Sequence, residues 1–548
     1  MMLGSQTLRS AARSREENFD DAPIQAAGSP IPRDACLKAT AILTIVFVYL
    51  VPAPSKAEIL ESQVLVVYNS AAAGATDLKD VYLAAHPGIP AANVLDLNSA
   101  TLDRADVTHA QFATLIRNPI RNYLLSMAGP APQQIVSIVL IRPFPHRVLD
   151  MNQSTVGDFP SNAGPRFNAG NANYASVDSE LVLLWHDLNT GEADGTMDSL
   201  TDNIIDNPYH TSAVPIESFS RANITTPKTY TNRGNVAWVL GGSGATQLTP
   251  GDMYLVTRID GPTQDDAIAG LHRAQNLRIN KALVRIILDE YNTSSGQDLD
   301  NHRLFAINCP FFAGNDYEET AALLIADGWD VRYDNTADFI EAHEEPNPII
   351  AYASYGENHS QNGLGQNPPG NGTYMIGFDY PPGAIFNTIE SFNARAFNGL
   401  DTRFNQGQVA TFISAGGTFG VGHVWEPFSF SIPDNEFLFV NFLVNGLSWG
   451  EAAYTSLPGL SWQYLVVGDP LARATIVNDP GVPKGDLNGD GSADGLDIAV
   501  FIDLVLNGVT GYHATYPALD PIARGDFTGD YRVDLDDLSG FLNTLLAP

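Results

Sequence analysis

Near its C-terminal end the chain repeats one pattern at an offset of 40 residues, since Asp486 to Asp497 is matched by Asp526 to Asp537. Each copy has oxygen-bearing side chains at alternate positions and is followed by apolar residues at helical spacing. The apolar residues are Ile498, Phe501, Ile502 and Val505 in the first copy and Leu538, Phe541, Leu542 and Leu545 in the second. A unit this short cannot bury an apolar face by itself, so we expect the two copies to pack against each other as halves of one small domain.

The oxygen pattern of the two loops predicts a hard metal ion as the ligand. Ca²⁺ binds about six to eight oxygens, and a loop of this kind supplies them from positions 1, 3, 5, 7, 9 and 12. Two bound Ca²⁺ ions are therefore predicted; the alternative is an acidic, solvated tail. The predicted ligands are Asp486, Asn488, Asp490, Ser492 (carbonyl), Asp494 and Asp497 in the first loop, and Asp526, Thr528, Asp530, Arg532 (carbonyl), Asp534 and Asp537 in the second.

The two loops differ at position 6, where the sharp turn requires a residue that tolerates positive φ. Gly491 meets this requirement in the first loop, and Tyr531 stands at the same place in the second. We therefore expect local strain and weaker binding in the second loop.

The duplicated loop and helix resemble the type I dockerin module, an EF-hand-like domain, over roughly Lys484 to Leu546. The resemblance implies an all-α domain with two Ca²⁺ ions, folding that depends on them, and docking to a cohesin-like scaffold protein. In that family, positions 10 and 11 of each loop influence partner choice and are often a Ser-Thr pair. Here they are Gly495 with Leu496 and Leu535 with Asp536. The calcium chemistry therefore carries over, and the identity of the partner does not.

The charge balance of the chain excludes some partners. A net charge of -33 over 548 residues argues against nucleic acid and anionic membrane surfaces. Part of the excess acid is accounted for by the predicted calcium ligands.

An apolar run near the N-terminus predicts export. Residues Ala39 to Val51 are apolar or small, with Arg33 and Lys38 before them and Ser55-Lys56-Ala57 after them. The run is shorter than the roughly 20 residues of a membrane span, so it predicts a signal peptide cleaved after Ala57. The long segment before the run also suggests a misplaced start codon, and an uncleaved anchor is the alternative. We expect a secreted protein, extracellular or associated with the cell envelope, without a membrane span after cleavage.

The chain contains two cysteines. Cys36 would leave with the signal, and Cys309 would remain alone, so no internal disulfide is expected. A large core and calcium are then expected to supply the stability.

The body of the chain predicts an α/β fold with a largely parallel sheet, because apolar strand patterns alternate with helical ones. Predicted strands lie at 63–69, 134–144, 237–242, 253–261, 285–291, 303–309, 330–335, 348–356 and 409–417, and a turn into a strand lies at 88–97. Predicted helices lie at 78–85, 110–126, 263–277 and 318–326, and a helix followed by a strand lies within 450–474. We divide the chain into an N-terminal extension and signal (1–57), a first α/β part (58–300) with an insertion at about 150–230, a second α/β part (301–478), a linker (479–483) and the calcium-binding segment (484–548).

Polar side chains follow several of the predicted strands. Ligands of open α/β sheets bind at the carboxyl ends of strands, so we expect these side chains to line one cleft. They are Arg142, His146 and Arg147 after 134–141, Asp260 after 253–259, Glu357 and His359 after 348–356, and His423, Trp425 and Glu426 after 409–417, joined from the insertion by Asp178, Glu180, His186 and Asp187. Of these, the catalytic candidates are His146, Asp260, Glu357, His359, His423 and Glu426. The alternative is that they are ordinary polar residues at the ends of strands and helices. The sequence contains no H-E-x-x-H, G-x-S-x-G, Walker or Rossmann motif.

The body resembles an uncharacterised family of secreted bacterial proteins found in genomes that carry the exosortase sorting system. The resemblance rests on QVLVVYNS, GIPAANV, SVDSELVLLW, YLVTRIDGPT, VWEPF and SWQYLVVGDPL, in this order between Gln63 and Arg473. It implies no activity. The chain has the dockerin-like segment where many exosortase clients have a C-terminal sorting signal.

The body is also similar to gingipain-type cysteine peptidases, which have a two-part caspase-like α/β fold. In that family one strand ends near a catalytic His, another ends in a catalytic Cys, and Gly-Asp-Pro follows near the end. This chain has Tyr355 to His359 at the first strand end, Ile413 to Gly416 at the expected second one, and Gly468-Asp469-Pro470. Ile413 to Gly416 contains no cysteine and Cys309 is on another predicted strand, so we expect no peptidase activity of that type.

Three functions follow from these patterns. The first is a calcium-binding protein that is attached to a scaffold and presents a cleft for a polysaccharide or peptide ligand. The second is an extracellular hydrolase on polysaccharide or peptide, in which paired carboxylates such as Asp260 and Glu426 would serve as acid and base. A separation of roughly 5–10 Å in an open cleft would favour this function. The third is a structural protein of the cell envelope without a cleft.

Overall fold

The computed structural model describes residues 58–149, 174–186, 205–226, 228, 248–290, 316–336, 339–356, 374–397, 408–425, 427 and 431–546. The chain divides into two compact units, 1–55 and 56–548, and every described residue belongs to the second. The predicted signal peptide, the predicted strands at 237–242 and 303–309, and Cys309 lie outside the described residues. Within the described ranges, no helix combines the length and the apolar character that crossing a membrane requires.

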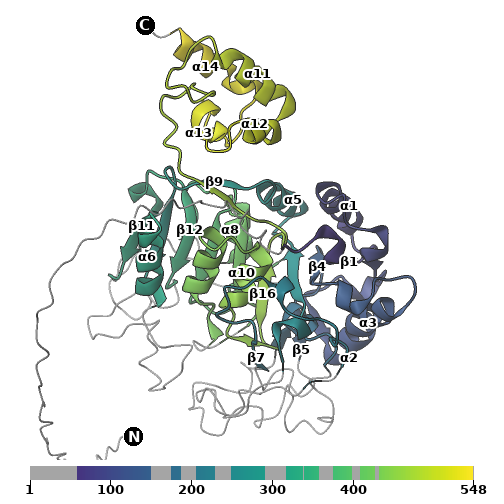
Figure 1. Cartoon of the computed structure of the whole chain (residues 1–548). Coiled ribbons are helices and arrows are strands. Elements are labelled where there is room, and N and C mark those ends of the chain that lie inside the picture. The colour runs from purple at the N-terminus through teal and green to yellow at the C-terminus, as the bar shows by residue number, and fades with distance from the viewer. Residues whose placement is uncertain are drawn as a thin grey trace, which may run out of the picture. The chain divides into compact units, whose positions relative to one another are not determined.

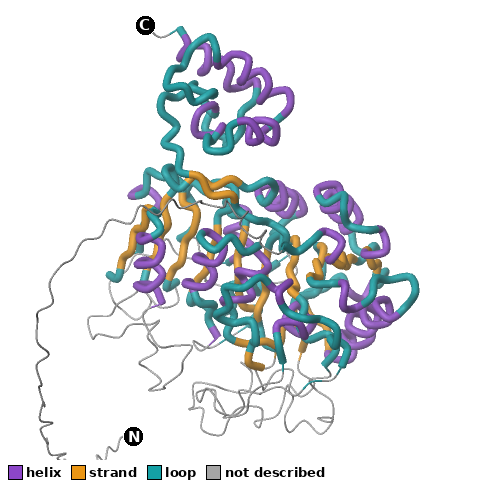
Figure 2. The backbone as a smooth tube through the Cα atoms, in the orientation of Figure 1, coloured by secondary structure: helices purple, strands orange, loops and turns teal. Residues whose placement is uncertain are grey.

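A large sheet organises the body, and Figure 2 shows its strands side by side with helices packed around them. Ten strands of the described residues form it, in the order β11-β10-β12-β13-β14-β16-β8-β4-β1-β2. Figure 1 labels β11, β12, β16, β4 and β1 among them. The strands are β1 (Val64–Tyr68), β2 (Val94–Asp96), β4 (Ser137–Ile141), β8 (Leu255–Ile259), β10 (Arg285–Asp289), β11 (Asp330–Asp334), β12 (Ile349–Ser354), β13 (Ile385–Thr388), β14 (Phe419–His423) and β16 (Tyr464–Val467).

The sheet is parallel except at one junction, where β14 pairs with β16 antiparallel. The five strands from β16 to β2 are parallel to one another, and so are the five from β14 to β11. The predicted class, α/β with a largely parallel sheet, is therefore confirmed. The strand predicted for the middle of the sheet is β4, which is buried throughout and lies between β1 and β8. One sheet joins strands from both sides of residue 300, because β10 pairs with β11 and β12.

Helices of the body match most of the predicted segments. The predicted helix at 110–126 is continuous through a π-helical turn at Phe112–Arg117. The one at 263–277 begins after Thr263, whose side chain accepts a hydrogen bond from the N–H of Asp266 and so caps the helix. The helices are α1 (Ala75–Ala85), α2 (His109–Gln111), α3 (Asn118–Leu125), α4 (Val177–Val182), α5 (Gln264–Arg273), α6 (Asp316–Ala326), α8 (Val409–Ser414), α9 (Asn441–Leu443) and α10 (Trp449–Ser456).

Three small sheets of the described residues complete the body. The first joins β3 (Asp106–Thr108), β5 (Arg147–Leu149) and β6 (Tyr174–Ser176), and the second joins β7 (Ile205–Asp206) and β15 (Gly459–Leu460). The third joins β9 (Arg278–Asn280) and β17 (Thr475–Val477). This third sheet lies next to the linker, and β9 contacts the C-terminal segment.

The strand predicted at 409–417 is wrong. Val409–Ser414 forms the helix α8, and the strand of this region is β14, Phe419–His423. A short apolar run does not distinguish a buried strand from a buried helix, and Gly416, with φ +110°, allows the helix to end. The glycine-rich β14 had no apolar signal because α8 packs on it: a Cβ on Gly420 would lie 2.6 Å from a methyl group of Val409. β13 was also not predicted.

The C-terminal segment has its own apolar cluster, formed by Leu487, Phe501, Leu504, Tyr512 and Phe541. Phe501 and Phe541, which are equivalent residues of the two repeats, stack with ring centroids 4.4 Å apart. The helices are α11 (Asp497–Asn507), α12 (Val509–Thr515), α13 (Pro521–Gly525) and α14 (Leu538–Leu545), yellow-green to yellow in Figure 1.

Part of the apolar face predicted to be buried between the repeats is exposed. Phe501 and Phe541 are 2% and 1% exposed, whereas Ile502 and Leu542 are 51% and 43% exposed. Ile498 and Leu538 are exposed as well. The contact between the two helices is narrower than the apolar stripe on each, so a row of side chains on each helix remains open to solvent.

Candidate functional site

The antiparallel junction separates the predicted strand-end residues. Asp260 follows β8 at the carboxyl edge of its parallel block, beyond the pair Arg258 and Val467. His423 is paired with Tyr464, the first residue of β16, and so lies at the opposite edge of the sheet. The prediction that the carboxyl ends of all these strands meet at one edge is therefore wrong, because it assumed a wholly parallel sheet.

At the first edge, Asp178 and Asp260 belong to a buried ion-pair network around Arg258. The Arg258 guanidinium is fully buried and donates from Nε to Asp178 at 3.0 Å and from Nη1 to Asp260 at 3.0 Å. Burial raises the pKa of both carboxyl groups, and the charge of Arg258 opposes that shift. Arg142 lies 3.6 Å from Asp260 and donates to the carbonyls of Gly261 and Pro262. The arrangement holds α4 against β8 and presents no open acid–base pair.

Sequence reasoning missed Arg258. It lies in β8, LVTRI, whose residues are all buried. The sequence did contain a signal for it, because a charged residue in a buried strand requires a buried partner of opposite charge.

The other candidates of this region have separate partners. His146 contacts the carbonyl oxygen of Arg395 through Nε2 at 2.7 Å, and Arg147 pairs with Asp106. Glu180 accepts a hydrogen bond from Ser461 at 2.6 Å. His186 is buried, and its carbonyl oxygen accepts from Arg121. These contacts hold chain segments together rather than gather the side chains around one point.

Asp469 of the Gly468-Asp469-Pro470 motif is likewise buried. It contacts Nε2 of His86 at 2.8 Å and accepts from the Gln275 amide at 2.9 Å. It therefore joins α1 and the end of α5 to the turn after β16.

At the second edge, His423 is fully buried and its ring packs beside Tyr464. Burial lowers the pKa of His423 to about 3, although the main chains of Ser431 and Glu390 beside it oppose the shift. Its imidazole is therefore neutral at ordinary pH. Trp425 packs under the guanidinium of Arg395, which lies 4.4 Å from the ring centroid. Glu357, His359, Glu426 and Asp187 lie outside the described residues.

Two buried carboxyl–phenol pairs, which sequence reasoning missed, lie at the carboxyl ends of β10, β12 and β13. The Tyr374 hydroxyl donates to Glu390 at 2.7 Å, and the Tyr352 hydroxyl lies 3.4 Å from Asp289. Burial raises the pKa of Asp289 well above its usual range. Gly356 makes room for Glu390, because a Cβ there would lie 2.1 Å from Glu390 Cγ. No regular spacing in the sequence links these residues, which come together only in the sheet.

The neighbours of β12 are β10 and β13, so the expected second strand end at Ile413 to Gly416 is wrong. The segment Ile413 to Gly416 ends helix α8, and the strand end next to Gly356 continues into Ile389, Glu390 and Ser391. This second position also contains no cysteine.

A further pair of acids lies near β13, at the start of α6. Asp316 accepts hydrogen bonds from the main-chain N–H groups of Asn435 and Glu436, both at 3.0 Å. Burial and the neighbouring Asp434 raise the pKa of Asp316 to about 7, and burial and Asp316 raise the pKa of Glu436 to about 7.

In the C-terminal segment the two predicted loops share one hydrogen-bond pattern. The carboxylate at position 1 accepts from the main-chain N–H at positions 4 and 6: in the first loop Asp486 accepts from Gly489 at 2.7 Å and Gly491 at 3.0 Å. In the second loop Asp526 accepts from Gly529 at 2.6 Å and Tyr531 at 2.8 Å.

The carboxylate at position 12 closes each loop in the same way. Asp497 accepts from the N–H groups of Leu487 at 2.7 Å and Asp494 at 2.9 Å. Asp537 accepts from the equivalent Phe527 at 2.7 Å and Asp534 at 2.9 Å. Position 6 has positive φ in both loops, +94° at Gly491 and +62° at Tyr531, as the loop pattern predicts.

These loops fit Ca²⁺ in their donor chemistry and main-chain conformation. In the described part of the chain no three His, Cys, Asp or Glu side chains converge as a metal cluster. Each loop, however, also offers amide or hydroxyl and main-chain carbonyl oxygens. Its first and last carboxylates accept from the loop's own N–H groups, and its other oxygens are of the kind that Ca²⁺ binds.

Comparison with models of known protein families found none that matches this chain, and comparisons with curated proteins and with solved structures found no match.

Proposed function

We propose that the protein binds two Ca²⁺ ions through a dockerin-like module at 484–546, and that this module attaches the α/β body to a cohesin-like scaffold outside the cell. The observation that carries the proposal is the hydrogen-bond pattern shared by the two loops, in which equivalent aspartates accept from equivalent N–H groups. An acidic tail without ligand would have no reason to hold its carboxylates in the same way twice.

When bound, Ca²⁺ would neutralise the carboxylates that each loop brings together. The first loop would hold it with Asp486, Asn488, Asp490, Asp494, Asp497 and the carbonyl of Ser492, and the second with Asp526, Thr528, Asp530, Asp534, Asp537 and the carbonyl of Arg532.

The exposed apolar rows on α11 and α14 support the docking role. Ile498, Ile502 and Leu506 stand at intervals of four residues on one helix and its end, and Leu538, Leu542 and Leu546 repeat the row 40 residues later. Exposed apolar patches commonly mark protein–protein contacts. The two rows give a scaffold protein an apolar helical face to bind.

For the body, we propose a caspase- or gingipain-like arrangement in two parts without the peptidase chemistry. The parallel block from β11 to β14 and the neighbouring ends of β12 and β13 support the likeness. In this proposal Glu390 and Ser391 would take the place of the family's cysteine. The body would then bind a polysaccharide or peptide rather than cleave one. The hydrolase alternative gains no support from Asp260, because its carboxylate is buried against Arg258.

The experiment is a calorimetric Ca²⁺ titration of the secreted chain from residue 58. We expect about two ions per chain and about one in either Asp497→Ala or Asp537→Ala, because each variant removes the last ligand of one loop. Asp503→Asn, an exposed acid on α11 outside both loops, is the matched control and should bind as the unmodified chain does. Absence of calcium binding in the unmodified chain would refute the proposal.

A further inference from the structure

The residue that breaks the loop pattern, Tyr531, contacts the body of the protein. Its hydroxyl is buried. Together with Asp379 of the body, which precedes β13, Tyr531 lines a cavity of about 510 Å³. At the equivalent place in the first loop, a Cβ on Gly491 would meet nothing within 4 Å. Position 6 therefore faces open space in one loop and the body in the other.

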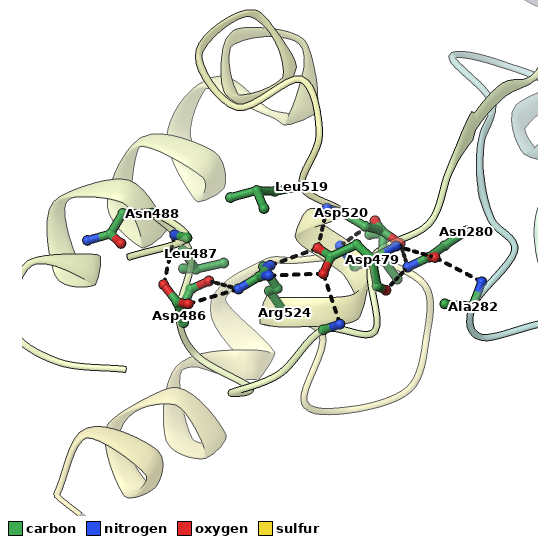
Figure 3. A network of polar contacts seen from close by, with 12 residues as sticks. Asn280, Ala282, Asp479, Asp486, Leu487, Asn488, Leu519, Asp520 and Arg524 are labelled. Atoms are coloured by element: carbon green, nitrogen blue, oxygen red, sulfur yellow. Dashed lines mark hydrogen bonds and ion pairs between the residues drawn. The ribbon is translucent and has the colours of Figure 1, made fainter. Parts of the chain in front are cut away.

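Strand β9 supplies the second set of contacts. Arg278 donates through Nη2 to the carbonyl oxygens of Pro517 and Leu519, the latter at 2.7 Å. Asn280 donates to the carbonyl oxygen of Asp479 and, at 3.0 Å, to the carboxylate of Asp520 (Figure 3). The chain from α12 to α13 is thus held to the body through its main chain and through Asp520.

Arg524 extends this network to the first calcium loop. Its guanidinium donates to both carboxylate oxygens of Asp479, at 2.7 and 2.9 Å, and to the carboxylate of Asp486 at 3.0 Å (Figure 3). Asp486 is the predicted first ligand of the first loop. A continuous set of polar contacts therefore runs from Asn280 in the body, through Asp479 and Arg524, to a calcium ligand.

We call the contact between Arg278, Asn280 and Asp379 of the body and the C-terminal segment the seam. Two cavities, of about 510 and about 550 Å³, flank it and are lined by residues of both the body and the C-terminal segment, including Arg278, Asp520 and Tyr531.

We propose that Arg278, Asn280 and Asp379 form an internal docking surface for the calcium-binding segment, so that calcium binding and the seating of this segment on the body stabilise each other. This inference rests on the proposed calcium binding. Because the contacts reach both loops, through Arg524 on Asp486 and through Tyr531, the free energy of seating depends on the conformation of the loops. Thermodynamic reciprocity then requires the affinity for calcium to depend on seating.

The first test is Arg278→Ala in the chain from residue 58, titrated with Ca²⁺. This variant removes a body residue that touches no calcium ligand, and we expect the affinity to fall by about fivefold or more. Lys281→Ala is the matched control, because Lys281 bonds Asp327 within the body, and it should leave the affinity unchanged. Calcium binding that is equal in all three proteins would overturn this inference and leave the proposed function intact, whereas no binding in any of them would refute the proposed function itself.

The second test is Tyr531→Gly. A loop that acts alone and a loop that is held on the body predict opposite changes in calcium affinity for this variant. If the loop acted alone, glycine would relieve the strain of φ +62° and calcium would bind more tightly. Because Tyr531 is seated on the body, we expect weaker binding instead. Tyr531→Phe keeps the ring and the strain but loses the hydroxyl beside Asp379, and its affinity should lie between those of the glycine variant and the unmodified chain.

A third measurement needs no variant. We expect the amides of Ile279 and Asn280 to exchange hydrogen faster when calcium is removed with a chelator, while those of β4 do not change. Unchanged exchange at β9 would show that seating is independent of calcium and would overturn the proposal.

Discussion

At the residue scale, two buried basic side chains of the body differ in their charge. Arg258 keeps its charge because Asp178 and Asp260 lie on either side of its guanidinium. His423 instead lies beside the main-chain groups of Ser431 and Glu390, so burial drives its imidazole to the neutral form. Neither residue is suited to general acid–base catalysis at neutral pH, and both are better explained as parts of the packed interior.

The depressed pKa of His423 predicts a specific dependence of stability on pH. With a pKa of about 3 in the folded chain and 6.5 as the ordinary value, the unfolded chain binds more protons between these limits. The contribution of His423 to stability is therefore complete above about pH 6.5 and is lost as the pH falls toward 3, at up to about 1.4 kcal/mol per pH unit.

Urea unfolding at pH 7.5, 6 and 5 measures this effect. His423→Gln should show a shallower loss of stability with acid than the unmodified chain, whereas His343→Gln, which alters an exposed residue, should not change the slope. Parallel pH profiles for all three proteins would contradict the assignment.

At the scale of elements, the close approach of α8 to β14 explains the glycines of the strand Phe419–His423. Gly420 faces a methyl group of Val409, and Gly422 faces Ala394 and Asn393. The helix can lie this close only because the strand lacks side chains on that side. The same feature removed the apolar alternation by which a strand is recognised in a sequence.

Gly420→Ala should therefore destabilise the body, by about 1–3 kcal/mol, because overpacking a filled interior forces the helix to shift. The matched test is a double variant with Val409→Ala, which removes the methyl groups that the new Cβ would meet and should recover part of the loss. Chemical denaturation of the two single variants and the double variant gives the coupling between the sites. Additive effects would show that α8 does not press on β14 at this point.

At the scale of the whole molecule, the sheet unites the two parts of the body. β16, from the second part, lies between β14 and β8, and β10, from the first part, lies between β11 and β12. Each part thus completes the sheet of the other.

We accordingly expect the fragment 58–300 to lack a stable fold when it is expressed alone. β10 would lose both of its neighbours and β8 would lose β16, which exposes apolar strand edges. Circular dichroism and solubility of this fragment, compared with 58–478, provide the measurement. A soluble 58–300 fragment with a cooperative unfolding transition would show that the two parts fold separately.

The sequence by itself determined those features that depend on neighbouring residues. Local periodicity identified most strands and helices, including the helix predicted at 263–277, and the loop pattern predicted positive φ at Gly491 and Tyr531. Only the tertiary structure decided which strand ends face one another. The single antiparallel pairing of β14 with β16 reverses half of the sheet and places Asp260 and His423 at opposite edges. The parallel pairing of β12 with β10 brings Asp289 to Tyr352 from a distant segment, and the pairing of β12 with β13 places the pair of Tyr374 and Glu390 at the same strand ends. Strand direction within a sheet is set by long-range pairing, which leaves no trace in the spacing of residues along the chain.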